Sequence, residues 1–494
     1  MSASRLHSTP AAPASPDATR ERPNIVFVIT DQQRFDTIAA LGHDHVDTPN
    51  LDRLVAEGAA LTRTYVTSPS CAPSRASLFS GLFPHTTGVL RNDEPWHHSW
   101  VERLGEAGYH CVNVGKMHTY PYEASVGFHE RHVVENKDRD TPRLPFYLDT
   151  WDKALWARGV RKPSRVTYAE REDYTERLGA FEWEPPADLH ADTFVGSLAA
   201  MWLERWRGDR PFFLQVGFPG PHPPYDPTPQ ALDAYRDRDV PLPSRSPEEI
   251  AAQPQALQDL RAQHMGVDHD AIVHLDEPTE EQLLRQRRHY HANVTMIDEQ
   301  IGVLRDALAA RGVLDDTVII FTSDHGDTLN DHGHSQKWTM YEGSVHVPAV
   351  VWGPGRIAAG QVLDGLTSHM DLGPTVLELA GVEVPSWFEA RSLLPALRGE
   401  EYPGRPEVFS EHARDRILSG TALMTMVVRD RWKLVSYLDP DDGQLFDLEA
   451  DPGELHDLYD EAEHAPVRAE LESAIHRWRA ESQLRTAAWS EQFR

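Results

Sequence analysis

The residues whose types and spacing point most directly to chemistry lie between Ser70 and Gly81, with Cys71 near the start. Pro73 suits the first turn of a helix, where an N–H would be unpaired anyway, and Gly81 suits the end of one. The segment therefore predicts a short helix that has Cys71 at its N-terminus and Arg75 one turn later on the same face. A helix N-terminus favours negative charge, so this is a candidate site for an oxyanion.

Cys71 is compatible with three roles. It could be a buried thiol that only packs in the core, or it could ionise at the helix N-terminus and act as a thiolate nucleophile. The third role follows from a family resemblance that is described below.

Two pairs of polar residues, each with one aspartate, follow apolar runs that are typical of buried strands. Asp31 and Gln32 come after the run 24–29, and Asp324 and His325 come after the run 318–323. Open α/β sheets place their sites just past the carboxyl ends of such strands. Taken alone, Asp31 could equally cap the next segment.

Basic side chains occur at four further points. Lys116 and His118 follow an expected strand at 108–115, and we expect them on the same side of an extended chain. His222 stands in a turn of prolines and glycines, which is a poor place for a core histidine. Lys337 lies in a polar loop.

These residues need a scaffold, and the pattern of the chain predicts an α/β fold. Continuous apolar runs indicate strands that are buried on both faces, and helical stripes separate them. We expect a large, mostly parallel mixed sheet sandwiched by helices, with a smaller C-terminal α/β subdomain. The expected strands are 24–29, 108–115, 212–217, 318–323 and 347–353, and the expected helices include 49–58, 279–312, 371–379 and 467–478.

The chain divides into three parts by composition. Residues 1–22 are rich in Ala, Ser, Pro and Arg without an apolar signal segment, which predicts a flexible tail on a cytoplasmic protein. Residues 23–403 form the expected catalytic domain, with insertions near 136–190 and 224–278 that we expect to cover the site. Residues 404–494 form the C-terminal subdomain, a small sheet followed by a terminal helix.

The net charge of the chain excludes some classes of binding partner. A net charge of −29 argues against nucleic acid or an anionic membrane surface, because both need a basic footprint. An anionic substrate would therefore need a local cluster of cations. The two cysteines imply no disulfide framework, and Cys111 is expected to be a small core residue. We find no apolar run long enough to span a bilayer.

The pattern Cys71-x-Pro73-Ser74-Arg75, followed by Ser80-Gly81, resembles the signature of the sulfatases within the alkaline phosphatase superfamily. Segments 432–434 and 445–454 also resemble the end of a sulfatase chain. The resemblance implies an alkaline phosphatase-like fold and hydrolysis of an organic sulfate monoester. It also implies that a formylglycine-generating enzyme oxidises Cys71 to formylglycine, whose hydrate supplies the nucleophile.

The same resemblance implies a metal site. Asp31, Gln32, Asp324 and His325 resemble the four protein ligands that sulfatases present to one divalent cation, and position 71 completes the set. Oxygen donors of this kind favour Ca²⁺, Mg²⁺ or Mn²⁺ over Zn²⁺. The family points to Ca²⁺, with Mn²⁺ and Mg²⁺ as alternatives.

The reaction assigns roles to the remaining candidates, because sulfate ester hydrolysis needs a held nucleophile, a cationic cradle and a proton for the leaving oxygen. Arg75 would hold the nucleophile, and Lys116 and Lys337 would cradle the sulfuryl group with the cation. His222 or Lys337 would protonate the leaving oxygen. His118 would take a proton from the second hydroxyl of the hydrated formylglycine.

Two departures from the common pattern concern the substrate. Many sulfatases carry Asp-Asp and Asp-Asn where this chain has Asp31-Gln32 and Asp324-His325, and this variant resembles the branch that holds choline sulfatases and phosphonate monoester hydrolases. Lys116 and His118 match the Lys-x-His pair of sulfatases, whereas phosphonate monoester hydrolases carry hydroxyl residues there. A phosphonate or phosphate ester hydrolase with the same site therefore stays an alternative, as does an inactive binding protein with unoxidised Cys71.

Asn92 could contact the ester, as the matching residue does in that branch, or it could be an ordinary turn residue. We expect a small-molecule or sugar sulfate ester as substrate, held by walls from the two insertions, in which no motif identifies the ester.

Overall fold

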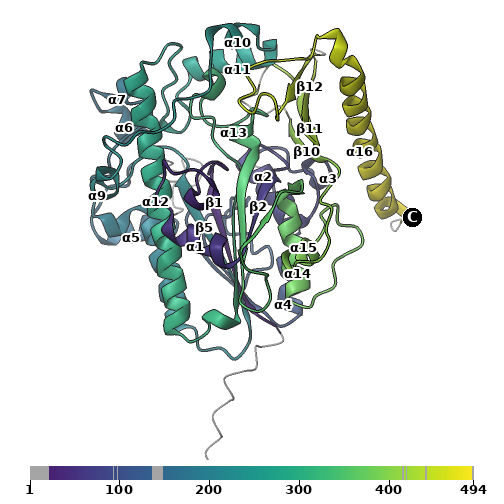
Figure 1. Cartoon of the computed structure of the whole chain (residues 1–494). Coiled ribbons are helices and arrows are strands. Elements are labelled where there is room, and N and C mark those ends of the chain that lie inside the picture. Colours follow the sequence, from purple (N-terminus) through teal and green to yellow (C-terminus); the bar gives the residue numbers. More distant parts are fainter. Residues whose placement is uncertain are drawn as a thin grey trace, which may run out of the picture.

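The computed structural model describes most of the chain (Figure 1). The expected N-terminal tail lies outside the described residues except for Arg22, and so does the start of the first insertion. The described residues are 22–92, 94–96, 98–135, 148–413, 417–418, 420–439 and 442–491, with side chains described up to 485.

A large mixed sheet forms the centre of the molecule. Its strand order is β4-β3-β5-β1-β6-β7-β2-β8, and β9 pairs with β2. Only β7 runs against the other strands of this sheet, so the expectation of a mostly parallel sheet is confirmed. The strands are β1 (Asn24–Asp31), β2 (Ala59–Tyr65), β3 (His110–Gly115), β4 (Glu130–Val133), β5 (Phe212–Pro221), β6 (Thr317–Ser323), β7 (His346–Trp352), β8 (Gln361–Leu363) and β9 (Thr367–Ser368).

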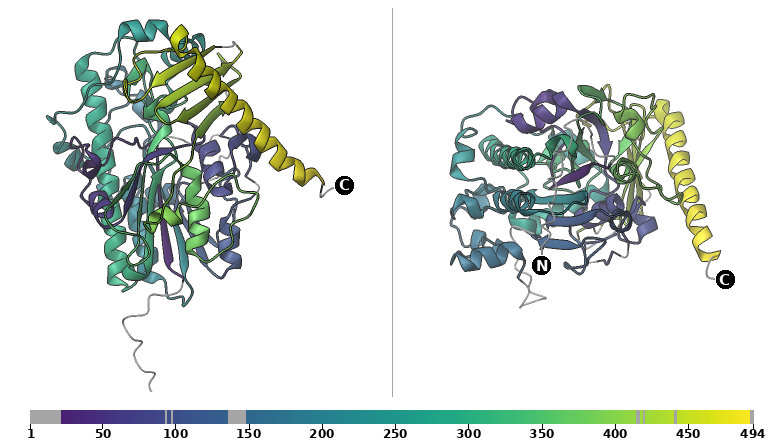
Figure 2. Two further views of the ribbon diagram at one scale, coloured as in Figure 1. Left: turned by 45° about the vertical axis from the view of Figure 1, so that its right-hand side comes forward. Right: turned by 90° about the horizontal axis from the view of Figure 1, so that it is seen from below.

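Helices cover both faces of this sheet (Figures 1 and 2). Alternate residues of β1 enter two separate cores, with Phe27 in one and Val28 in the other. This explains the uninterrupted apolar run, since neither face of the strand meets water. One core is shared with α2 (Cys71–Ser80), α4 (Val101–Glu106) and α14 (Leu372–Leu379). The other is shared with α1 (Pro49–Glu57), α8 (Ala191–Arg205) and α12 (Glu280–Ala310).

The helix α2 begins at Cys71, with Ser70 as its N-cap and Pro73 in its first turn. It ends at Gly81, which adopts φ 73° and closes the helix through its N–H on Ser77. The predicted helix is confirmed, and Cys71 is the first residue of that helix.

A second, antiparallel sheet follows the first. It contains β10 (Val408–Ala413), β11 (Leu423–Arg429), β12 (Trp432–Leu438) and β13 (Asp442–Asp447), and α16 (Ala465–Glu491) packs across it (Figure 2). A tight turn joins β11 and β12: Arg429 pairs with Trp432, and Asp430 turns the chain at φ 51°. The domain boundary at residue 403 stays a prediction.

The two expected insertions are built from short helices. The described part of the first contains α5 (Thr150–Ala157), α6 (Arg165–Ala169) and α7 (Tyr174–Arg177). The second contains α9 (Pro229–Asp233), α10 (Pro247–Ala252), α11 (Gln255–Gly266) and a 3-10 turn at His269–Ala271. Tyr168 and Phe181 of the first share a small core with Ala271 and Val273 of the second. The remaining helices are α3 (Pro84–Thr87), α13 (Glu342–Val345) and α15 (Leu394–Leu397).

Candidate active site

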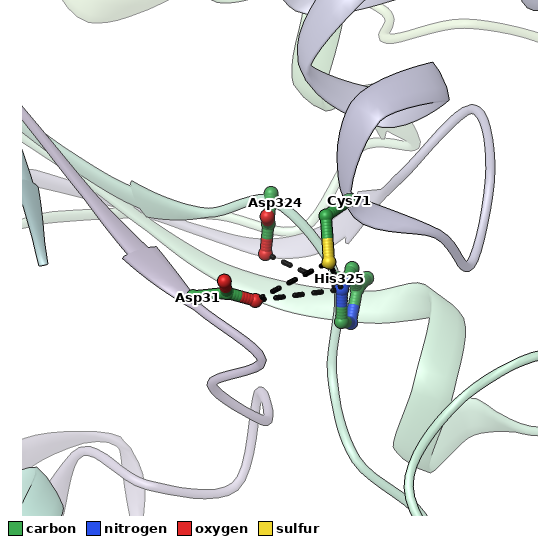
Figure 3. Close-up of side chains that lie close together, drawn as sticks. All are labelled: Asp31, Cys71, Asp324 and His325. Carbon is green, nitrogen blue, oxygen red and sulfur yellow. Dashed lines mark hydrogen bonds and ion pairs between the residues drawn. The ribbon is translucent and has the colours of Figure 1, made fainter. Parts of the chain in front are cut away.

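Four buried side chains converge at the carboxyl edge of the large sheet: Asp31, Cys71, Asp324 and His325 (Figure 3). Strands β1 and β6 are parallel neighbours whose last pair is Thr30 with Ser323, so the residues that follow lie side by side. The N-terminus of α2 brings Cys71 to the same point. The candidate ligand atoms of these four residues all lie within 4.8 Å of one another.

The spacing of these atoms fits a shared cation. Oδ1 of Asp31 lies 3.6 Å from Sγ of Cys71 and 3.6 Å from Nε2 of His325, and Oδ1 of Asp324 lies 3.7 Å from that same nitrogen. Two ligand atoms that each lie about 2.4 Å from one ion are about 3.4 Å apart when they meet it at right angles. The four side chains therefore fit a group that sits between them.

Backbone and side-chain partners orient His325 of this cluster and one further ligand, Gln32. Nδ1 of His325 donates to the carbonyl oxygen of Gly326 at 2.8 Å, which leaves Nε2 as the atom that faces the cluster. Gln32 donates from Nε2 to Asp327 at 2.6 Å, so its Oε1 points the other way. Gln32 adopts φ 74°, and its N–H donates to Asp324. These contacts direct an imidazole nitrogen and an amide oxygen toward the same place, which fits a hard divalent cation.

Three cations surround the cluster. Nζ of Lys337 lies 3.2 Å from Sγ of Cys71 and 2.9 Å from Oε1 of Gln32. The ammonium of Lys116 contacts Asp31. The guanidinium of Arg75 donates to Asp324 at 2.7 Å and to the Lys116 carbonyl at 3.1 Å. Its Nη2 is buried and has no hydrogen-bond partner within the part of the chain that the structure describes, which suits an oxygen supplied by a ligand.

These charges shift the ionisation of Cys71 and Asp31. Burial and the Asp31 carboxylate oppose ionisation of the thiol, but the nearby ammonium groups of Lys337 and Lys116 outweigh them. The pKa of the Cys71 thiol is therefore lowered. Burial alone would raise the pKa of Asp31, yet Lys116, and then His222 and Lys337, hold it well below its usual value. The site therefore stabilises negative charge at both positions.

Two further candidate histidines, His222 and His118, differ in their surroundings. His222 follows Pro221, which pairs with Asp31 across β1 and β5. Its Nδ1 donates to the carbonyl oxygen of Pro223 at 2.8 Å, and burial, followed by Lys337, lowers its pKa well below the usual value. The backbone at His118 is not extended, because β3 ends at Gly115 and His118 adopts φ 57°. The expected alternation of Lys116 and His118 along an extended chain is therefore wrong; the N–H of His118 instead donates to Glu135.

Asn92 lies beside the cysteine helix. Its Oδ1 accepts from the N–H of Ala72 at 3.2 Å, which satisfies one of the free amides at the start of α2. This contact places Asn92 next to Cys71, and contact with an ester stays a prediction.

Sequence reasoning assigned no role to several residues that hold the site. Asp327 orients Gln32 and also accepts from Tyr225 at 2.6 Å. His369 lies 2.9 Å from Oγ of Ser74, which ties α2 to the loop before α14. Asp327 lies within the acidic cluster after β6 and could have been singled out there, whereas nothing near His369 in the sequence marks it.

The sheet order, the helix that presents Cys71 and the buried cluster define a sulfatase-like member of the alkaline phosphatase superfamily. Residues 23–382 match the family model of the sulfatases, and residues 330–481 match that of the C-terminal region of N-sulphoglucosamine sulphohydrolase. The chain belongs to the sulfatase family, and the enzyme class is sulfuric ester hydrolase.

Individual relatives cover nearly all of the chain. A choline-sulfatase of Rhizobium meliloti is 34% identical over 89% of this chain and 83% of its own, and an arylsulfatase of Clostridium perfringens is 29% identical over 90% and 91%. The phosphonate monoester hydrolase of Agrobacterium radiobacter has a similar structure, with a TM-score of 0.78 at 26% identity over 93% of this chain and 96% of its own.

Proposed function

We propose that this protein hydrolyses an organic sulfate monoester to an alcohol or phenol and sulfate, with Cys71 as the precursor of a formylglycine. The observation that carries the proposal is the convergence on Cys71 of hard metal ligands and a ring of cations. A thiolate nucleophile would not need the carboxylates of Asp31 and Asp324 beside it, since they oppose its ionisation. An oxygen nucleophile that attacks an anionic ester makes use of both sets of residues.

One divalent cation would be held by Asp31, Gln32, Asp324 and His325, together with the residue at position 71. Two carboxylates and an amide oxygen favour Ca²⁺, and Mn²⁺ or Mg²⁺ would fit the same donors. When bound, the cation would neutralise the carboxylates and polarise the oxygens beside it.

The chain's own side chains would bind and move protons around the ester. Arg75 holds the hydroxyl of the hydrated formylglycine, since its guanidinium already bridges α2 and Asp324 and keeps one nitrogen without a partner in the described chain. Lys116 and Lys337 bind the non-bridging oxygens of the sulfuryl group, where negative charge develops. His222 or Lys337 protonates the leaving oxygen, and His118 accepts the proton of the second hydroxyl.

Several further assignments belong to this proposal. A formylglycine-generating enzyme would oxidise Cys71, which lies on α2 at only 1% exposure and would be reached before the site closes around it. The substrate would be a small-molecule or sugar sulfate ester, with Asn92 near the ester and the insertions near 136–190 and 224–278 forming the walls. We keep a cytoplasmic location as part of the proposal. In the described residues, no helix combines the length and the apolar character that crossing a bilayer requires.

A phosphonate or phosphate ester hydrolase is the second candidate. The likeness to the phosphonate monoester hydrolase of Agrobacterium radiobacter favours it, as does the Asp-Gln and Asp-His form of the cluster. Lys116 argues for the sulfate ester, because its ammonium contacts Asp31 at the place where phosphonate monoester hydrolases carry a hydroxyl residue. Matched aryl sulfates and aryl phosphonates separate the two: we expect the higher kcat/KM for the sulfate.

The proposal is tested at Cys71 itself. We expect the tryptic peptide Thr64–Arg75 from active enzyme to be lighter than the cysteine form, since formylglycine weighs less than cysteine. Replacing Cys71 by Ala should abolish turnover of an aryl sulfate while circular dichroism stays unchanged. Cys111→Ala is the matched control, because that thiol lies in the core of β3 away from the cluster. Full activity of Cys71→Ala overturns the proposal, and an unoxidised peptide in inactive protein supports a binding protein instead.

A further inference from the structure

A carboxylate from the second insertion stands beside the candidate acid of the reaction. Asp270 is 2% exposed, and its Oδ2 lies 3.6 Å from Nε2 of His222. Its other oxygen, Oδ1, lies 3.4 Å from the guanidinium of Arg165 in α6. Two insertions that are distant in sequence therefore meet at one carboxylate next to His222.

The ring orientation of His222 makes this contact specific. Nδ1 donates to the carbonyl oxygen of Pro223, which can only accept, so Nδ1 carries a hydrogen. Nε2 is consequently the atom that gains or loses a proton, and it is the atom that faces Asp270. At 3.6 Å the pair is longer than a hydrogen bond, as catalytic contacts often are before the substrate binds.

The other groups around His222 differ from Asp270 in their effect on the protonated imidazole or in their other contacts. Burial, Lys337 and Lys116 all favour the neutral imidazole. Asp31 favours the protonated form, but its carboxylate also contacts Lys116 and belongs to the candidate metal cluster. Asp270 also favours the protonated form of His222, stands outside that cluster, and favours the charged form of Lys337.

The backbone that presents Asp270 is unusual. Asp270 adopts φ 54° and Ala271 adopts φ 61°, so two successive residues other than glycine lie in the left-handed region. Such strain persists where surrounding contacts enforce it and is concentrated at functional sites. Tyr168 and Phe181 pack against Ala271, which fixes the turn against the first insertion.

We propose that Asp270 is the positioning residue that orients the ring of His222 and stabilises its protonated form, so that Nε2 can donate a proton to the leaving oxygen. The inference rests on the proposed function. As the nucleophile's oxygen forms its bond to sulfur, the bond from sulfur to the leaving oxygen breaks and its electron pair goes to that oxygen. The oxygen takes the proton from Nε2, and His222 is left neutral beside Asp270 until solvent returns the proton.

Asp270→Asn tests the charge with little disturbance, because asparagine tolerates the left-handed backbone as well as aspartate does. Asp268→Asn is the matched control: it removes a partly exposed carboxylate from the same turn. Each variant is assayed with a series of aryl sulfates whose phenols range from acidic 4-nitrophenol to basic alkyl-substituted phenols. A proton donor matters little for the acidic phenol and most for the basic ones.

We expect Asp270→Asn to lower kcat by about 10- to 100-fold for the most basic phenol and by much less for 4-nitrophenol, with KM nearly unchanged. The Asp268→Asn variant should match the wild type throughout. In a His222→Ala background, Asp270→Asn should have no further effect, since the two residues act as a unit. An equal loss for every phenol would assign Asp270 a purely structural role, and a loss confined to esters with a cationic leaving group would assign it to substrate recognition; either result overturns the proposal.

The same assays separate this inference from the proposed function. A wild-type enzyme that turns over only the phosphonate series refutes the sulfate proposal, and the leaving-group dependence is then measured on phosphonates. A wild-type enzyme with an oxidised Thr64–Arg75 peptide and no turnover of either series refutes both.

Discussion

The ammonium of Lys337 lies 3.2 Å from Sγ of Cys71, although 266 residues separate the two in the chain. The same ammonium contacts Oε1 of Gln32 at 2.9 Å, so a single cation spans the candidate nucleophile and a candidate metal ligand. Burial opposes this charge, but Cys71, Asp31 and Asp270 raise the pKa of Lys337 above its usual value. The lysine is therefore charged in the site at neutral pH.

Lys337→Met should lower kcat for an aryl sulfate by about 10²- to 10³-fold, because it removes a preorganised charge from the place where the sulfuryl oxygens gain charge. Steady-state kinetics measure the effect, and circular dichroism checks the fold. Lys153→Met, which changes an exposed lysine of α5, should leave kcat unchanged. An unaltered kcat in Lys337→Met would remove this lysine from the mechanism.

Removal of the cation should destabilise the enzyme and stop turnover. A ligand at 100 times its Kd stabilises the native state by about 2.7 kcal/mol, so chelation followed by added Ca²⁺ should lower and then restore the unfolding temperature. Asp324→Asn should abolish this response, because that carboxylate belongs to the cluster, whereas Asp315→Asn at an exposed position should retain it. Elemental analysis that finds only Zn²⁺ would contradict the choice of a hard cation.

Acid should destabilise the second insertion through its buried histidines. Burial lowers the pKa of His274 to about 4, with smaller contributions from Arg261 and Arg245. Between pH 6.5 and 4 the unfolded state therefore binds a proton that the folded state does not, and stability falls as the pH falls through this window. The loss from His274 alone reaches about 3 kcal/mol near pH 4.

His274→Asn should reduce this acid sensitivity, since asparagine can still reach Oγ of Ser335, which lies 2.6 Å from Nδ1 of His274. Urea unfolding midpoints at pH 7 and pH 4.5 measure the difference. His456→Asn, at an exposed histidine, is the control and should behave as the wild type. An identical pH dependence in both variants would refute the assignment.

Lys433 joins the second sheet to α13, the helix that leads into β7 of the large sheet. It lies in β12, is fully buried, and its ammonium lies 3.0 Å from Glu342 and 2.7 Å from Glu454. Lys433→Met leaves the buried carboxylate of Glu454 and the partly buried one of Glu342 without their cation, which should destabilise the protein by about 3–5 kcal/mol. The unfolding midpoint in urea should fall, with Lys153→Met again unchanged; an equal midpoint in both variants would show that the network contributes no stability.

Much of the fold follows from local pattern. The apolar run 24–29 marks β1 because both of its faces are buried, and Thr279 with Gln282 marks the start of α12 through a capping box. The pairing of β1 with β6 as parallel neighbours then brings Asp31 and Asp324 together. The polar residues that follow β1 and β6 could therefore be assigned to the carboxyl edge of the sheet from the sequence alone.

The alternation expected for Lys116 and His118 failed for a physical reason. The chain leaves the strand at Gly115, whose φ of 98° starts an irregular loop, and a period of two applies only while the backbone stays extended. The left-handed φ of His118 comes with contacts of its backbone to Glu135, which no local pattern marks.

The residue types and spacing in the chain were enough to fix the motif around Cys71, the strands that carry Asp31 and Asp324, and the family. These features depend on backbone geometry over a few residues and on burial of both strand faces, which a sequence records as periodicity. The contacts of Lys337 with Cys71, of Asp270 with His222 and of Asp327 with Gln32 became visible only in three dimensions. They join loops that are far apart in the chain, and packing between irregular segments leaves no period in the sequence to read.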